Sequence, residues 1–152
     1  MNIKRFRHIA IIVQSMDAML PFYQNILGFR IKRDSIIDSP EFQKGLSLPG
    51  ASARCVHLAL TDSSIDLELL EFSPPDRRNS ENPAVNDCGF RHIALVVNNL
   101  EATVAELKQK GVVFHSPPIR FETPKEIKGF RFVYLKDPEG NFIELNELPE
   151  GT

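Results

Sequence analysis

The sequence is poor in the residues that mark several classes of protein. Among its 152 residues it has no tryptophan and only two cysteines, Cys55 and Cys88. Their separation fits neither a metal or redox motif nor the framework of a disulfide-rich domain. Basic and acidic side chains nearly balance, with a formal net charge of -2. The charge therefore gives no reason to expect nucleic acid or an anionic membrane as a partner.

Long apolar segments are also missing. No run of apolar residues approaches the roughly 20 that are needed to cross a bilayer, and the N-terminal segment has no signal-peptide cleavage pattern behind it. Hydrophobic residues make up 42% of the chain and charged residues 25%, which is the balance of a folded globular protein. We therefore expect a cytoplasmic protein with neither a membrane nor a nucleic-acid partner.

A repeated segment is the most informative feature that is present. Residues 6–10 read Phe-Arg-His-Ile-Ala, and residues 90–94 read the same, 84 positions later. Similar residues follow in both copies, and each copy then runs into a helical stretch that ends at a glycine, Gly28 or Gly111. Five consecutive identities in matching contexts indicate an internal duplication.

Each copy predicts a strand, a helix and further strands, so we expect an α+β fold of two βαβββ modules. Alternating apolar residues predict the strands, and a helical pattern that begins at a capping residue predicts each helix. In the first copy, strands are expected at 6–13, 29–36, 54–61 and 65–72, with a helix at about 15–27 that Pro21 fits poorly. In the second copy we expect a strand at 90–97, a helix at about 100–110, a short strand near 112–115 and a hairpin at 130–147. The predicted modules are residues 1–75 and 89–152, joined by a polar, proline-rich linker at 76–88.

The predicted hairpin fixes one pair of residues across its two strands. Its turn, residues 137–141, reads Asp-Pro-Glu-Gly-Asn, with proline where φ is preset and glycine where a left-handed residue is needed. A three-residue loop of this kind pairs Asp137 with Asn141. Counting back along both strands then places Tyr134 directly opposite Glu144.

Two histidines and two glutamates are the candidate metal ligands. His8 and His92 occupy equivalent positions in the two repeated strands, and each half also ends in an apolar strand that carries a carboxylate. In the second half this acid is Glu144. A buried carboxylate is costly without a compensating charge, and a metal ion supplies that charge. Two imidazoles and two carboxylates suit a six-coordinate divalent ion with two places left for water or substrate.

In the first half, any of three acidic residues could be the metal ligand. Asp66 and Glu68 share one face of the predicted strand at 65–72, and Glu71 lies on the other.

Taken together, these segments resemble the vicinal oxygen chelate superfamily, which includes glyoxalase I, methylmalonyl-CoA epimerase, bleomycin resistance proteins and extradiol dioxygenases. The resemblance lies in His-Ile-Ala at 8–10 and 92–94, Phe22-Tyr23, Leu27-Gly28-Phe29, the acidic strand at 67–71, and residues 137–145. It implies an open, mostly antiparallel barrel around one metal ion, and it selects Glu68 as the acid of the first half. The implied ligands are therefore His8, Glu68, His92 and Glu144, and the ion is Zn, Ni, Co, Mn or Fe.

The resemblance implies three alternative activities. The first is a metal-dependent lyase or epimerase, similar to lactoylglutathione lyase, that chelates two neighbouring oxygens of a small substrate and stabilises an enediolate. In it, Glu68 or Glu144 moves the proton. The second is a ferrous-iron ring-cleaving dioxygenase, with two histidines and one glutamate as ligands. The third is a non-enzymatic binder of the resistance type. The presence of Glu68 and the short chain favour the first.

Other residues are assigned by the same reasoning. Tyr134 and Phe132 are candidates for the substrate pocket, and the proline-rich stretch from Ser116 to Gly129 resembles a mobile lid. His57 and His115 are interpreted as ordinary histidines outside the site. Exposed apolar sheet edges lead us to expect a homodimer.

Overall fold

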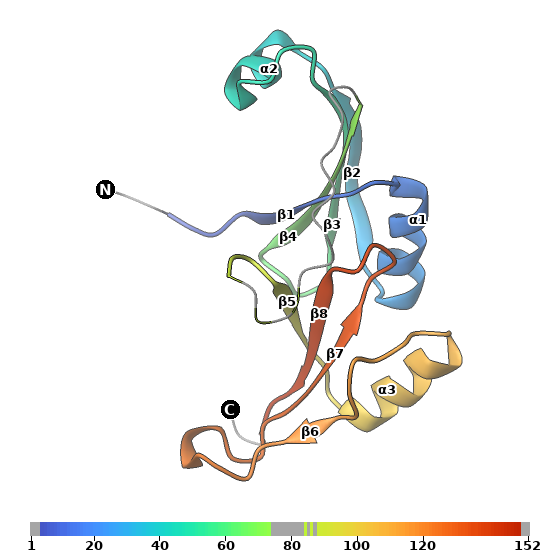
Figure 1. Ribbon diagram of the computed structural model, residues 1–152, viewed down its shortest axis with the longest axis vertical. Helices are drawn as coiled ribbons and strands as arrows, with labels where there is room; N and C mark the ends of the chain where they lie inside the picture. The colour runs from blue at the N-terminus through green and yellow to red at the C-terminus, as the bar shows by residue number, and fades with distance from the viewer. Residues whose placement is uncertain (1–3, 74–83, 85, 87, 150–152) are drawn as a thin grey trace. The chain divides into compact units, whose positions relative to one another are not determined.

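The chain folds into two compact units, Met1–Asn79 and Ser80–Thr152. The computed structural model describes residues 4–73, 84, 86 and 88–149. Most of the predicted linker at 76–88 lies outside these described residues. Each unit contains one four-stranded sheet (Figure 1). None of the described helices is long and apolar enough to span a membrane.

The first unit builds its sheet in the order β1-β4-β3-β2. The strands β1 (His8–Ile12) and β4 (Asp66–Ser73) run parallel, whereas β3 (Ser52–Ala59) and β2 (Arg30–Ile37) are antiparallel to their neighbours. One face of this sheet is covered by the segment between β1 and β2, through the buried side chains of Met16, Met19 and Tyr23.

The helix predicted at 15–27 is divided at its proline. The helix α1 (Met16–Pro21) begins at the capping residue Ser15 and continues into a π-helical turn, η1 (Phe22–Ile26). Pro21 has no backbone N–H to donate, so the regular hydrogen-bond pattern is interrupted there. Gly28 follows with a φ of 78°, a left-handed conformation that glycine adopts without strain.

A second helix in this unit was not predicted. The helix α2 (Pro40–Leu46) connects β2 to β3 and buries none of its side chains. Its apolar face consists of only Phe42, which stacks on Phe72, and Leu46, and two residues are too few to produce a helical pattern in the sequence. Its only signal is the cap, where the Ser39 side chain accepts the N–H of Phe42 and proline occupies the first turn.

The second unit repeats the same topology, with the strand order β5-β8-β7-β6. The strands β5 (His92–Val96) and β8 (Phe142–Glu147) are parallel, and β7 (Arg131–Lys136) is antiparallel to β8. Between them, α3 (Leu100–Gln109) begins at Asn99, whose side chain accepts the N–H of Ala102. The predicted hairpin is present, with Tyr134 opposite Glu144 and the N–H of Asp137 donated to the carbonyl of Asn141.

The edge of the second sheet differs from the prediction. Near 112–115, where a short strand was expected, there is a single bridge between Phe114 and Leu135. The edge strand is instead β6 (Ile119–Arg120), and a 3-10 turn, η2 (Lys125–Ile127), follows it. Both lie inside the segment interpreted as a lid. The strand β6 was not predicted because it has only two residues and lies in a proline-rich segment.

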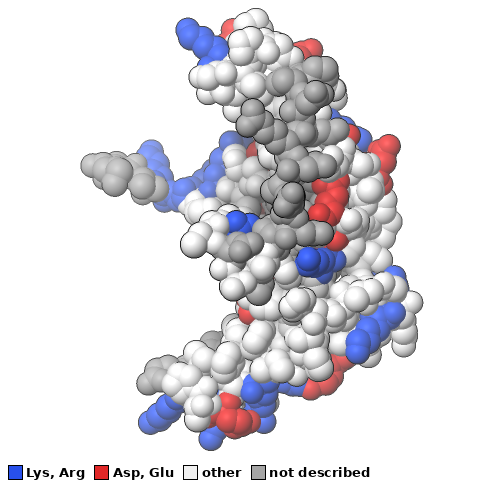
Figure 2. Space-filling view, viewed as in Figure 1, with Lys and Arg blue, Asp and Glu red and all other residues white. Residues whose placement is uncertain are grey.

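The α+β class is confirmed, as two mixed sheets with few helices. Among the described residues, each sheet is open and does not close into a barrel within its own unit. On the visible face, basic and acidic side chains are interspersed over the described residues (Figure 2). This mixture agrees with the near-zero net charge.

In both units, an acid near the end of the fourth strand binds the start of the first helix. The backbone N–H of Met16, at the start of α1, donates to Oε2 of Glu71 on β4 at 3.2 Å. In the second unit, the N–H of Leu100, at the start of α3, donates to Oε2 of Glu147 on β8 at 2.5 Å. A negative charge is favourable at a helix N-terminus because the N–H groups there lack partners within the helix.

Candidate metal-binding site

Within each unit, the candidate histidine and glutamate lie on neighbouring parallel strands in the same register. Glu68 on β4 is paired with Ala10, two residues after His8. Glu144 on β8 is paired with Ala94, two residues after His92. Residues two apart on a strand point to the same face, so each glutamate shares a face with its histidine. The small alanine between them leaves space for the two side chains to meet.

The two pairs have similar geometry. Nε2 of His8 lies 3.5 Å from Oε2 of Glu68, and Nε2 of His92 lies 3.2 Å from Oε2 of Glu144. An ion that binds two such atoms at about 2.1 Å, with bonds at right angles, would hold them about 3.0 Å apart. Both pairs are close to this separation. The imidazoles are about one-third exposed and the carboxylates 12–13%, so the donor atoms fit a metal that remains accessible to a substrate.

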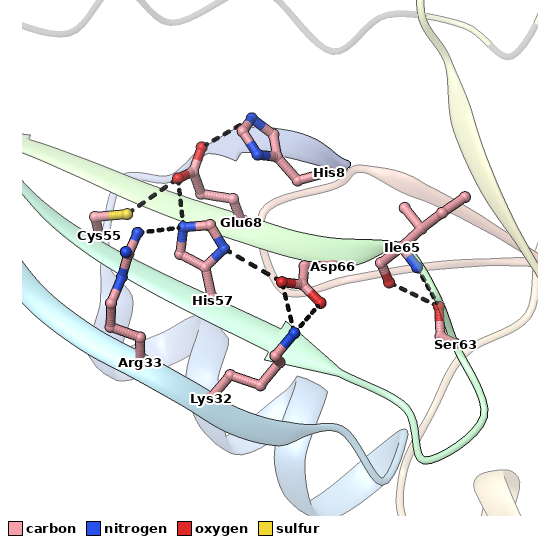
Figure 3. A network of polar contacts seen from close by, with 9 residues as sticks. All are labelled: His8, Lys32, Arg33, Cys55, His57, Ser63, Ile65, Asp66 and Glu68. Atoms are coloured by element: carbon pink, nitrogen blue, oxygen red, sulfur yellow. Dashed lines mark hydrogen bonds and ion pairs between the residues drawn. The ribbon is translucent and has the colours of Figure 1, made fainter. Parts of the chain in front are cut away.

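Glu68 has two further partners on β3 (Figure 3). Nε2 of His57 lies 2.8 Å from Oε1 of Glu68, and the thiol of Cys55 donates to the same oxygen at 3.1 Å. Oε1 is therefore occupied by residues of the sheet, whereas Oε2 faces His8. The two oxygens of this carboxylate consequently have different surroundings.

His57 is buried, and its Nε2 lies close to two other polar side chains. Its side chain is only 5% exposed, and burial lowers its pKa, an effect that the nearby Glu68 partly opposes. The ring is therefore neutral near pH 7 and carries a single N–H. A guanidinium nitrogen of Arg33 also lies 2.7 Å from the same Nε2. This nitrogen thus meets both a donor, Arg33, and an acceptor, Glu68.

Cys55 remains a thiol under ordinary conditions. Burial, followed by its contact with Glu68, raises the pKa of Cys55 to about 11. Even so, one donor atom each from Cys55, His57 and Glu68 lie within 4.8 Å of one another. These three groups are a second set in the first unit that could hold a metal ion, with Glu68 common to both sets. The sequence-based interpretation assigned no metal-binding spacing to Cys55.

In the second unit, Tyr134 occupies the position that His57 has in the first. His57 is paired with Glu68 across β3 and β4, and Tyr134 is paired with Glu144 across β7 and β8. Burial raises the pKa of Tyr134, and the charge of Glu144 and a hydrogen bond to it add to the effect. The ring of Tyr134 also meets that of His92 edge-on, with centroids 5.3 Å apart.

Phe132 belongs to a row of aromatic side chains beside this tyrosine. Its ring contacts Tyr134 edge-on at 5.9 Å and stacks on Phe121 at 5.3 Å. Phe132 and Tyr134 are two residues apart on β7 and therefore share the face on which Glu144 lies. The two pocket candidates thus form one aromatic surface that extends from Glu144 toward β6.

The structure brings together His8 with Glu68 in the first unit and His92 with Glu144 in the second. That these four residues hold one ion stays a prediction. The sequence-based interpretation missed His57, Cys55 and Arg33. For His57 the sequence offered no comparable count, because no tight turn like the one at 137–141 joins β3 to β4 and fixes the pairing of His57 with Glu68.

Comparison with known proteins gives a consistent result. The family model described as Glyoxalase/Bleomycin resistance protein/Dioxygenase superfamily matches residues 5–145. The uncharacterized protein YaeR of Escherichia coli is 31% identical over 147 residues, which cover 97% of this chain and 98% of YaeR. The mitochondrial methylmalonyl-CoA epimerase of Homo sapiens is 29% identical over 146 residues, covering 96% of this chain and 75% of the epimerase.

The fold has a similar solved counterpart. A glyoxalase family protein from Bacillus cereus superposes with a TM-score of 0.83 over 97% of this chain and 95% of that protein, at 19% sequence identity. At this identity the likeness concerns the fold alone.

Proposed function

Because the chain belongs to the glyoxalase, bleomycin resistance protein and dioxygenase superfamily, we propose that it is a metal-dependent lyase or epimerase acting on a small substrate. The observation that supports this proposal most directly is the repeated His–Glu pair. Each unit holds an imidazole nitrogen and a carboxylate oxygen 3.2–3.5 Å apart at the same register.

The proposed ligands are His8 and Glu68 from the first unit and His92 and Glu144 from the second. Together they offer two imidazoles and two carboxylates to one divalent ion, Zn, Ni, Co, Mn or Fe. Two carboxylates neutralise the ion's formal charge. When bound, such an ion supplies positive charge that stabilises the oxygens of an enediolate or enolate.

The proton transfer is assigned to the glutamates. A carboxylate beside the reacting carbon can accept its proton and return it at the same or a neighbouring carbon, which gives an isomerase, lyase or epimerase. In the first unit, Oε1 of Glu68 is occupied by His57 and Cys55, so a proton could be accepted only at Oε2, the oxygen that also faces His8. Glu144, with Tyr134 beside it, is the corresponding group of the second unit.

The metal content of purified protein and the fate of a substrate proton test this proposal. The expected result is one divalent ion per chain and exchange of a proton with deuterated water at a carbon next to a carbonyl. The substrates to test are a methylmalonyl-CoA epimer and a methylglyoxal-thiol adduct, with a catechol as the contrast. Oxygen uptake with ferrous iron and the catechol would instead identify a dioxygenase. Ligand binding without metal or turnover would identify a binding protein.

We also propose that the protein forms a homodimer. Phe6, Ile12, Phe90 and Val96 lie in or beside the edge strands β1 and β5, and each is more than half exposed. Apolar side chains on exposed sheet edges favour association with a second copy.

A further inference from the structure

A row of polar side chains crosses the first sheet on the face that carries His8 and Glu68. Arg33 on β2 is paired with His57 on β3, and His57 is paired with Glu68 on β4. Directly opposite residues of neighbouring strands point to the same face. The three side chains therefore lie in sequence, as Figure 3 shows, with the guanidinium and the carboxylate on either side of one imidazole nitrogen.

A β-bulge turns two consecutive basic residues toward this row. The pairing of β2 with β3 shifts register between Ile31 and Arg33, and a bulge of this kind places two residues against one on the partner strand. As a result, Lys32 reaches Asp66 while Arg33 reaches His57. Without the bulge, neighbouring residues on β2 would point to opposite faces.

Arg33 differs from its neighbours Lys32 and Arg54 in its lack of an acidic partner. Lys32 donates to both oxygens of Asp66 at 2.8 and 2.9 Å, and Arg54 donates to both oxygens of Asp34 at 3.1 and 2.7 Å. Within the described part of the chain, no carboxylate forms an ion pair with Arg33. An arginine is always charged and presents five N–H donors in a fork that matches a carboxylate or phosphate.

The side chain of Arg33 contacts His57 and Cys55, neither of which is an acid. Nε2 of His57 cannot accept a hydrogen bond from Arg33 and donate one to Glu68 at the same time. An anion that binds Arg33 would remove this competition and leave Nε2 free to donate its hydrogen to Oε1 of Glu68. Binding of the anion to Arg33 would therefore also fix the position of Glu68 through His57.

We infer that Arg33 is the substrate's anion-binding residue, and that the substrate carries a carboxylate or phosphate group in addition to its metal-chelating oxygens. This inference rests on the proposed function, because it takes the face with His8 and Glu68 as the substrate site. Arg33 is separated from Glu68 by one imidazole nitrogen, so the anionic group lies only a few bonds from the carbon that loses its proton.

Two simple acids test the inference directly. 2-Oxoglutarate and 2-oxovalerate have five carbons each and the same pair of neighbouring chelating oxygens, but only 2-oxoglutarate has a second carboxylate. Their affinities for metal-loaded protein are measured by calorimetry. We expect wild-type protein to bind 2-oxoglutarate about tenfold more tightly, which corresponds to about 1.4 kcal/mol.

Substitutions assign that preference to one residue. Arg33→Gln should abolish the preference for 2-oxoglutarate, and Arg33→Lys should retain part of it. Arg30→Gln removes the same charge from the same exposed strand and should retain all of it. Arg33 is exposed, and thermal unfolding of each variant verifies that it folds.

The outcomes separate this inference from the proposed function. Equal affinity of wild-type protein for the two acids, or an unchanged preference in Arg33→Gln, would overturn the role of Arg33 while metal-dependent binding of both acids still supports chelation. If metal does not increase the affinity for either acid, the proposed function is contradicted. A preference that is lost in Arg33→Gln without any metal would then still support the anion site.

Discussion

Replacing His57 with phenylalanine gives the most direct test of the network around Glu68. The two rings are similar in shape, so the change mainly removes the two nitrogens. The His57 side chain is 5% exposed and Glu68 12%, and water can replace little of what is lost. A buried polar group that loses its hydrogen-bond partner costs about 1–3 kcal/mol. For a chain of this length, that range corresponds to a fall in Tm of about 2–12 °C.

Metal binding should weaken by a comparable free energy. His57 holds Oε1 of Glu68 at 2.8 Å and so orients Oε2 toward His8. Loss of such a supporting contact lowers metal affinity by about 10–100-fold in characterised metal sites. We expect a decrease in that range for His57→Phe, measured by competition with a chromophoric chelator.

His115→Phe is the matched control. His115 meets the ring of Phe142 edge-on at 5.7 Å and belongs to neither His–Glu pair, so this substitution should leave metal affinity unchanged. A His57→Phe protein that binds metal as tightly as wild type would refute the reasoning. It would support the sequence-based interpretation of His57 as an ordinary histidine.

Three further predictions address the rest of the molecule. Glu144→Gln should abolish activity and weaken metal retention, as determined by turnover and metal analysis; an active, metal-bound variant would exclude Glu144 from the site. Glu147 has a lowered pKa because it accepts the N–H of Leu100 and a hydrogen bond from Arg131. Its stabilising effect is therefore complete above its ordinary value of 4.5 and is lost as the pH falls through the lower, folded-state pKa. Glu147→Gln should flatten this part of the Tm–pH curve, and an identical curve would contradict the assignment. Light scattering should give twice the chain mass of 17.2 kDa, and a monomer would contradict the dimer.

The sequence was most informative where a pattern was repeated. The duplicated segment at 6–10 and 90–94 predicted the common topology of the two units, because identical strands with identical neighbours fold alike. The turn at 137–141 predicted the register that pairs Tyr134 with Glu144, since its length permits only one alignment of the two strands.

Features that depend on distant contacts or weak local signals were missed. The role of His57 follows from its alignment with Glu68, and no tight turn between β3 and β4 resembles the one at 137–141. The basic residues that reach this network are turned toward it by a bulge in β2, which cannot be read from alternation alone. The sequence alone did not decide which of Asp66, Glu68 and Glu71 is the metal ligand, and the resemblance selected Glu68. In the structure, Asp66 binds Lys32, and Glu71 binds the start of α1.

The fourth strand of each unit carries two glutamates three positions apart, Glu68 with Glu71 and Glu144 with Glu147. One points to the histidine and the other caps a helix on the opposite side of the sheet. A shift of either strand by one residue would move both glutamates to the opposite faces of the sheet. The histidine would then lose its carboxylate partner, and the helix N-terminus would lose its capping acid. The strand alignment is therefore protected by two independent penalties, and errors in pairing during folding should be strongly disfavoured.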